Sequence, residues 1–142
     1  MLFRSIKIAS LSFQPILVSF CFTQDPASVL YTEKKVAAAK NLGIIMEVIA
    51  CEFAANNALL LAPLVKQQQQ RPEVVGVMIQ KPSRAIFMQA ASQLNIPFEQ
   101  WWESLRALLP EEKDVDGLGI ANARKIAAGQ KAIFPEIGRA HV

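Results

Sequence analysis

The 142-residue sequence predicts an α/β fold of three layers, in which a mainly parallel sheet is flanked by helices. Three apolar runs at 16–22, 44–50 and 74–79 are rich in β-branched residues and have the length of buried strands. Helix-forming segments separate these runs, and this alternation favours parallel strands joined by right-handed crossovers. The chain is long enough for one domain with a single core.

The first helix is expected directly after the first strand. Asp25 is a suitable N-cap, and Pro26 suits the first helical position. Gly43 then provides a usual carboxyl-terminal cap. A second helix is expected over 53–70, because the Arg-Pro pair at 71–72 ends it before the third strand.

Two more helices are expected beyond the third strand, one ending near Leu94 and one over 97–109. The stretch 113–119, Lys-Asp-Val-Asp-Gly-Leu-Gly, has the composition of an acidic turn. A short helix is expected over 121–128, with Gly129 as its cap.

Composition excludes several classes of function. The net charge is only +3 and no basic stripe alternates with aromatic residues, so we expect no nucleic-acid binding. No apolar run reaches the roughly 18 residues of a membrane helix, so we expect no membrane span. Cys21 and Cys51 lie in apolar segments and form no Cys-x-x-Cys pair, which fits a reduced, cytoplasmic setting. With His141 as the single histidine, we expect no metal site.

Both ends of the chain read as translated sequencing-adapter DNA. The opening Met-Leu-Phe-Arg-Ser and the closing Ile-Gly-Arg-Ala-His-Val correspond to the two strands of one common adapter. We therefore expect residues 1–5 and 137–142 to be non-native, and 6–135 to be a segment of a longer gene. Without His141 that segment contains no histidine, which excludes histidine-based acid–base chemistry from it.

Three polar side chains are expected to converge at one edge of the sheet. Tyr31 and Lys35 are four residues apart and share a helix face, and Gln80 directly follows the third strand. An aromatic ring can stack on a ligand, and a lysine partly removed from water can transfer protons. A buried glutamine can hold that lysine by a hydrogen bond. From spacing alone, the simpler interpretation is a surface lysine packed over an exposed tyrosine.

The acidic turn contains a further candidate. Asp114 and Asp116 alternate along it, and such residues are common in solvated turns for conformational reasons alone. A carboxylate on a rigid turn can instead accept hydrogen bonds from paired N–H groups of a heterocycle. The following Gly-Leu-Gly-Ile-Ala-Asn lacks the preceding strand and third glycine of a dinucleotide-binding fingerprint.

Three ordered blocks of the sequence closely resemble the bifunctional methylenetetrahydrofolate dehydrogenase/methenyltetrahydrofolate cyclohydrolase family. They are DPASVLYTEKKVAAAKNLGI, VVGVMIQKP and KDVDGLGIANARKIAAGQ. The resemblance covers nearly all of 6–135 and implies the truncated catalytic domain of a multifunctional enzyme of one-carbon metabolism and purine biosynthesis. Such an enzyme oxidises 5,10-methylenetetrahydrofolate to 5,10-methenyltetrahydrofolate with NADP, and hydrolyses that product to 10-formyltetrahydrofolate.

The resemblance also implies roles for individual residues. Lys35 matches the lysine of cyclohydrolase proton transfer, and Gln80 matches the glutamine that positions and tunes it. Tyr31 matches the ring that stacks on the folate, and Asp116 matches the carboxylate that anchors the pterin. Ser28 is expected to support the lysine.

Some features depart from the family pattern. Lys-Pro-Ser-Arg at 81–84 stands where the family usually has Leu-Pro-Leu-Pro, and the interval from Gln80 to Asp116 is longer than usual. The NADP-binding Rossmann domain of the family is absent, so we expect this fragment to bind no cofactor and to be inactive or nearly so. The family forms homodimers largely through that domain. Two alternatives are a relative that keeps only the cyclohydrolase step, and a non-catalytic α/β binding module.

Overall fold

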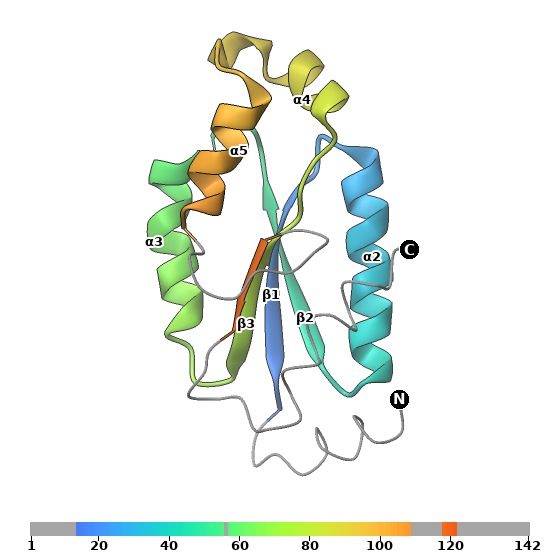
Figure 1. The fold of residues 1–142 in the computed structure, drawn as a ribbon. Coiled ribbons are helices and arrows are strands. Elements are labelled where there is room, and N and C mark those ends of the chain that lie inside the picture. Colours follow the sequence, from blue (N-terminus) through green and yellow to red (C-terminus); the bar gives the residue numbers. More distant parts are fainter. Residues whose placement is uncertain (1–13, 56, 109–117, 122–142) are drawn as a thin grey trace.

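The computed structural model describes residues 14–55, 57–108 and 118–121. Its sheet has the strand order β2-β1-β3-β4. The strands β1 (Ile16–Phe22), β2 (Ile45–Cys51) and β3 (Val74–Ile79) run parallel, and β4 (Leu118–Ala121) is antiparallel to β3 (Figure 1). The predicted α/β class and the mainly parallel sheet are confirmed.

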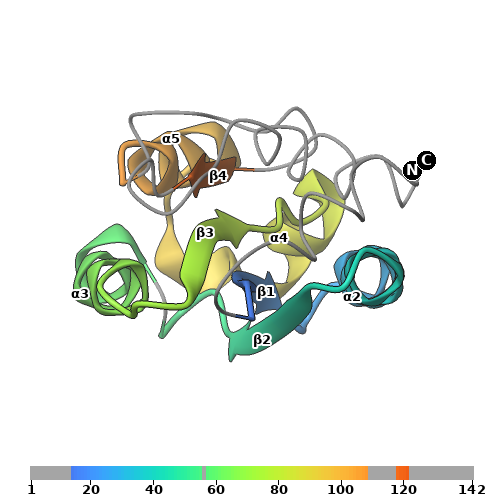
Figure 2. The ribbon, with the colours of Figure 1, turned by 90° about the horizontal axis from the view of Figure 1, so that it is seen from below.

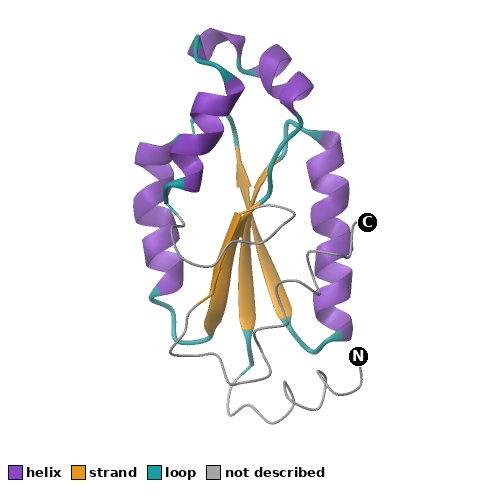
Figure 3. Cartoon of the chain, viewed as in Figure 1, coloured by secondary structure: helices purple, strands orange, loops and turns teal. Residues whose placement is uncertain are grey.

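The helices form the two outer layers of the domain. Helix α2 (Pro26–Asn41) covers one face of the sheet, and α3 (Ala58–Gln69) and α5 (Phe98–Arg106) cover the other (Figure 2). Helix α4 (Arg84–Ala90) and the 3-10 turn η1 (Ser92–Leu94) lie beyond the carboxyl ends of the parallel strands (Figure 3). Within the described ranges, no helix has the length and apolar character needed to cross a bilayer.

The sheet separates two hydrophobic cores, because successive residues of a strand point to opposite faces. Val18, Phe20 and Phe22 of β1 belong to the larger core, beneath α3 and α5. Leu17 of β1 belongs to the smaller core, where it packs with Ala39 of α2. Both faces of β1 are therefore buried, as its continuous apolar run predicts.

An aromatic cluster closes the larger core next to the carboxyl ends of the strands. The ring centroid of Trp101 lies 5.0 Å from that of Phe22, 5.5 Å from Phe53, 4.7 Å from Phe87 and 6.0 Å from Phe98. The pairs with Phe22 and Phe53 meet edge to face, which is a favourable arrangement for aromatic rings. The long segment that follows β3 is thus packed into the domain through α4 and α5.

The predicted helix over 53–70 starts later than expected. Helix α3 begins at Ala58, after Asn57, whose side-chain oxygen accepts a hydrogen bond from the Leu60 backbone N–H. Phe53 instead lies in the core, with an exposed fraction of 0%. The apolar pattern therefore begins before the true start of the helix, because Phe53 is buried from a turn.

Strand β4 is absent from the elements that the sequence predicts. Its residues are Leu-Gly-Ile-Ala, and glycine and alanine are disfavoured in strands, so its position is set by pairing with β3. The helix predicted over 121–128 is wrong at Ala121, which belongs to β4. The rest of that predicted helix, and the acidic turn up to Gly117, lie outside the described residues.

Candidate functional site

The inward face of α2 is polar. The helix begins after Asp25, whose Oδ1 accepts a hydrogen bond from the Ala27 backbone N–H at 3.1 Å. Its buried residues recur at intervals of four, three and four, which is one helix face. They are Ser28, Thr32, Lys35 and Ala39. A face with this spacing usually carries apolar side chains toward a sheet, so three polar residues on it indicate a site rather than ordinary packing.

A buried lysine–glutamine pair lies at the centre of the site. Lys35 is 1% exposed and Gln80 is 4% exposed. The Lys35 Nζ donates a hydrogen bond to the Gln80 Oε1 at 2.8 Å. The Gln80 backbone N–H donates to the Phe20 carbonyl oxygen at 2.9 Å, which extends the β1–β3 ladder one residue past the end of β3. The structure thus brings together two of the residues that the sequence predicts at this edge.

A second set of contacts joins the start of α2 to the loop after β3. Asp25 is 2% exposed and Ser28 is 1% exposed. The Ser28 hydroxyl lies 3.0 Å from Asp25 Oδ2 and 3.2 Å from the Lys81 carbonyl oxygen. The Ser83 backbone N–H donates to the same Oδ2 at 2.5 Å. We call these four residues the Asp25 clamp. Sequence reasoning identified Asp25 only as a helix cap.

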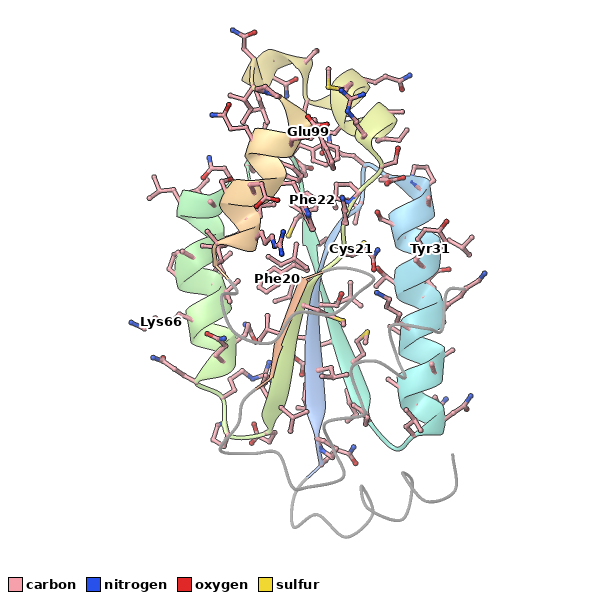
Figure 4. All side chains as sticks on the ribbon, in the orientation of Figure 1. Phe20, Cys21, Phe22, Tyr31, Lys66 and Glu99 are labelled. Carbon is pink, nitrogen blue, oxygen red and sulfur yellow. The ribbon has the colours of Figure 1, made fainter. Side chains whose placement is uncertain are left out.

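Tyr31 lies one turn before Lys35 on α2, and Figure 4 shows it on that helix. It is partly exposed, whereas Lys35 is buried. The structure therefore leaves part of a tyrosine side chain accessible on the helix that buries the lysine. Ser28, predicted to support the lysine, contacts Asp25 and Lys81, and its role stays a prediction.

The side chain of Lys81, in the loop after β3, is a cation that faces α5. The Nζ of Lys81 lies 5.8 Å from the ring centroid of Phe98 and 5.7 Å from that of Trp102, both on α5. Glu99 of α5, labelled in Figure 4, accepts a hydrogen bond from Arg84 Nε at 2.9 Å. The Lys-Pro-Ser-Arg stretch at 81–84 is where the sequence departs from the family pattern. Its two charged side chains contact α5, on the opposite side of the loop from Lys35.

The two cysteines are not suited to nucleophilic chemistry. Burial raises the pKa of the Cys21 thiol, and it raises the pKa of Cys51 to about 12. The thiolate is the reactive form, so both side chains are unreactive near neutral pH. The Thr32 hydroxyl donates to the Cys21 sulfur at 3.4 Å, beneath α2 (Figure 4 labels Cys21).

A pocket of about 330 Å³ opens between α2 and β2, with Cys21, Val36 and Val48 in its lining. Successive residues of a helix are rotated by roughly 100° about its axis, so the side chains of Val36 and Tyr31 point to opposite sides of the Lys35 side chain when α2 is viewed along its axis. The pocket is therefore on the flank of α2 away from Tyr31, and it borders the polar face of the helix through Thr32.

Asp116, predicted to anchor the ligand's heterocycle, lies outside the described residues. Among the residues that the structure describes, no three histidine, cysteine, aspartate or glutamate side chains gather as metal ligands. The candidate site is thus built from Lys35, Gln80, Tyr31 and the Asp25 clamp.

Comparisons with known proteins identify a family that the chain matches over most of its length. The model of the family described as "Tetrahydrofolate dehydrogenase/cyclohydrolase, catalytic domain" matches residues 4–116. The Bifunctional protein FolD of Heliobacterium modesticaldum is 33% identical over 132 residues, which cover 91% of this chain and 41% of the relative. That of Acidiphilium cryptum is 33% identical over 130 residues, with the same coverage of both chains. That of Deinococcus radiodurans is 31% identical over 129 residues, covering 89% of this chain and 38% of the relative.

The chain therefore spans about two fifths of the length of these curated relatives. No solved structure matches it.

Proposed function

Because the chain belongs to the tetrahydrofolate dehydrogenase/cyclohydrolase family, we propose that it is the folate-binding catalytic portion of a one-carbon-metabolism enzyme. The whole enzyme oxidises 5,10-methylenetetrahydrofolate to 5,10-methenyltetrahydrofolate with NADP and hydrolyses this product to 10-formyltetrahydrofolate. The observation that carries the proposal is the buried hydrogen bond from Lys35 Nζ to Gln80 Oε1.

Hydrolysis of a methenyl bridge needs a group that moves protons. Water must lose a proton as it adds to the bridging carbon, and the ring nitrogen must gain one as its bond to that carbon breaks. Lys35 is the only lysine of α2 that is buried, and it is the group that we assign to this transfer. Gln80 has no titratable proton of its own, so it orients the lysine without competing for the proton.

The other assignments concern substrate binding. Tyr31 lies one turn before Lys35, and we assign its accessible ring to stacking on the folate. Ser28 supports the site through the Asp25 clamp. Asp116 is assigned to anchoring the pterin, on the family resemblance alone.

NADP does not fit the described residues. The segments that follow β1, β2 and β3 are Thr-Gln-Asp-Pro, Glu-Phe-Ala-Ala and Gln-Lys-Pro-Ser, and none contains the glycines that a pyrophosphate-binding turn requires. We therefore assign NADP binding and the oxidation step to a further domain of the whole protein, and we assign homodimer formation to it on the family resemblance alone.

Folate binding by the purified 142-residue chain tests the proposal, with 5,10-methenyltetrahydrofolate as the titrant in calorimetry. We expect saturable binding, which Tyr31→Ala weakens about three- to tenfold and Tyr31→Phe preserves, because the ring supplies the contact. Hydrolysis is followed by the loss of methenyl absorbance. Any rate above that of buffer should fall by about 10² or more in Lys35→Ala.

Lys34→Ala is the matched control, since Lys34 is the exposed neighbour of Lys35 on the same helix. Unchanged hydrolysis by Lys35→Ala would remove Lys35 from the mechanism. Absence of any folate binding by the wild-type chain would instead favour a non-catalytic α/β module, and rapid NADP-dependent turnover would contradict the assignment of NADP to another domain.

A further inference from the structure

We propose that Asp25 is a positioning residue, which holds Gln80 against Lys35 by fixing the loop after β3 to the start of α2. This inference rests on the proposed function only in calling Lys35 catalytic, because the mechanical link itself is a property of the folded chain. Asp25 touches neither Lys35 nor Gln80 in any hydrogen bond described above, so it acts through the backbone of Lys81 and Ser83.

The burial of the carboxylate shows that it does more than cap a helix. A helix cap needs one side-chain oxygen, and Asp25 Oδ1 fills that role by accepting from the Ala27 N–H. The second oxygen accepts from the Ser83 N–H, 58 residues along the chain, and lies 3.0 Å from the Ser28 hydroxyl. Both oxygens are thus engaged within a side chain that is only 2% exposed.

The clamp also limits where Gln80 can be. Gln80 is fixed on its amino-terminal side by the β ladder, through its N–H bond to Phe20. On its other side, the next residue, Lys81, presents its carbonyl oxygen to Ser28, and Ser83 is held by Asp25. The glutamine is therefore tied at both ends, and releasing the clamp frees the end that leads away from the sheet.

Helix α2 connects the two contacts mechanically. Ser28 and Lys35 are seven residues apart, two turns along the same buried face. A lysine side chain on a helix leans toward the amino terminus, so Lys35 reaches back toward the end at which the clamp lies. The loop after β3 is thus bonded to one rigid helix at two levels, once by Lys35 and once by the clamp.

Substitution by asparagine separates the two roles of Asp25. Asparagine is as good an N-cap as aspartate, so Asp25→Asn keeps the start of α2. Its amide has one acceptor oxygen, so the other position presents an NH₂ group that cannot accept from the Ser83 N–H. Asp25→Ala removes both the cap and the clamp, and Asn57→Ala removes a comparable cap from α3, away from the site.

The test measures access to Lys35 in the intact 142-residue chain, without any ligand. Reductive methylation under native conditions, quantified by peptide mass spectrometry, gives the rate at Lys35 relative to the exposed Lys34. We expect Asp25→Asn and Asp25→Ala to raise this ratio about tenfold, the factor that corresponds to one lost hydrogen bond to a charged group. Asn57→Ala should change it less than about twofold, although it too removes a helix cap.

The Gln80→Ala background tests the route of the effect. If Asp25 acts through Gln80, Gln80→Ala alone raises the Lys35 rate, and adding Asp25→Asn raises it less than about twofold further. A full additional tenfold increase would show that Asp25 acts by another route and overturn the proposal. If Asp25→Asn keeps the wild-type ratio of Lys35 to Lys34 methylation and only Asp25→Ala raises it, Asp25 acts as a helix cap alone and the proposal is overturned.

Folate titration of the same variants keeps the two proposals distinguishable. A wild-type chain that binds no 5,10-methenyltetrahydrofolate contradicts the proposed function but leaves the Lys35 measurement valid. A wild-type chain that binds folate, with Lys35 equally protected in Asp25→Asn, contradicts the positioning role alone.

Discussion

Replacing the buried pair by apolar residues should make the domain more stable. Lys35 and Gln80 are almost fully buried at the end of the sheet and are joined by one 2.8 Å hydrogen bond. Removing the lysine Nζ and the glutamine amide from water costs several kcal/mol, of which the hydrogen bond between them returns only a part. The double variant Lys35→Met/Gln80→Leu keeps similar side-chain volume and avoids that cost. We expect its free energy of unfolding to rise by about 1–3 kcal/mol.

The single variants should behave differently from the double. Gln80→Leu leaves the buried Lys35 Nζ without its amide acceptor, so we expect a loss of about 2–3 kcal/mol. Lys35→Met removes the buried Nζ but leaves the buried Gln80 amide without that donor, so the two effects nearly offset, to within about 1 kcal/mol. The summed single effects then differ from the double by several kcal/mol, which marks direct coupling.

Urea unfolding of the four proteins, followed by circular dichroism, measures this cycle. For a chain of this size, a gain of 2 kcal/mol corresponds to a rise in Tm of roughly 4–8 °C. The reasoning is refuted if the double variant is less stable than wild type by more than about 1 kcal/mol, since the pair would then stabilise the fold. Confirmation would mean that this edge of the sheet is built at the expense of stability, as functional sites often are.

Three further predictions concern groups away from this pair. Arg71 lowers the pKa of Glu47 through two hydrogen bonds on a partly exposed surface, so the stabilisation that this pair gives is present above the unfolded value of 4.5 and is lost as pH falls through the lower folded value. Glu47→Gln should therefore lower stability by at most about 1 kcal/mol at pH 7, and the difference from wild type should shrink in unfolding curves taken at successively lower pH below 4.5. Burial raises the pKa of Cys51 from 9.0 to about 12, so the unfolded chain loses this proton at a lower pH than the folded one. The free energy of unfolding of the wild type should therefore fall above pH 9 by up to roughly 1.4 kcal/mol per pH unit. Cys51→Ala should be less stable at pH 7, and its free energy of unfolding should fall less steeply with pH in this alkaline range. Lys81→Gln removes a cation held over two rings of α5 and should lower Tm by roughly 1–4 °C in thermal scans; an unchanged Tm would show that the cation–π contact contributes nothing.

The sequence predicts the parts of the fold that depend on local patterns. The apolar runs predict the three parallel strands, and the Asp-Pro start and glycine end predict the bounds of α2 within two residues. The expected convergence of Lys35 and Gln80 uses the parallel order, which brings the helix after β1 and the residue after β3 to one edge, and it also requires that Lys35 lie on the inward face of α2. Strand β4 could not be predicted this way, since its pairing with β3 comes from contacts distant in sequence.

The Asp25 clamp shows why part of the site has no signature in the sequence. Two of its contacts are to backbone atoms, the carbonyl of Lys81 and the N–H of Ser83, and every residue type except proline has both groups. A helix-capping aspartate followed three residues later by serine is a common start of a helix, so the pattern predicts the cap but not the long-range partner.

Helices α2 and α5 show how a site can nevertheless be located from the arrangement of polar residues. Helix α5 has buried residues at Phe98, Trp101, Trp102 and Leu105, which are aromatic or aliphatic, and with this face it covers the core. Helix α2 places Ser28, Thr32 and Lys35 on the corresponding inward face. Hydrophobic packing alone would replace these three by apolar residues, because buried polar groups gain little net stability even when they are paired. Their presence on a face that is otherwise suited to packing is what distinguishes a helix that carries a site from a helix that only covers a sheet.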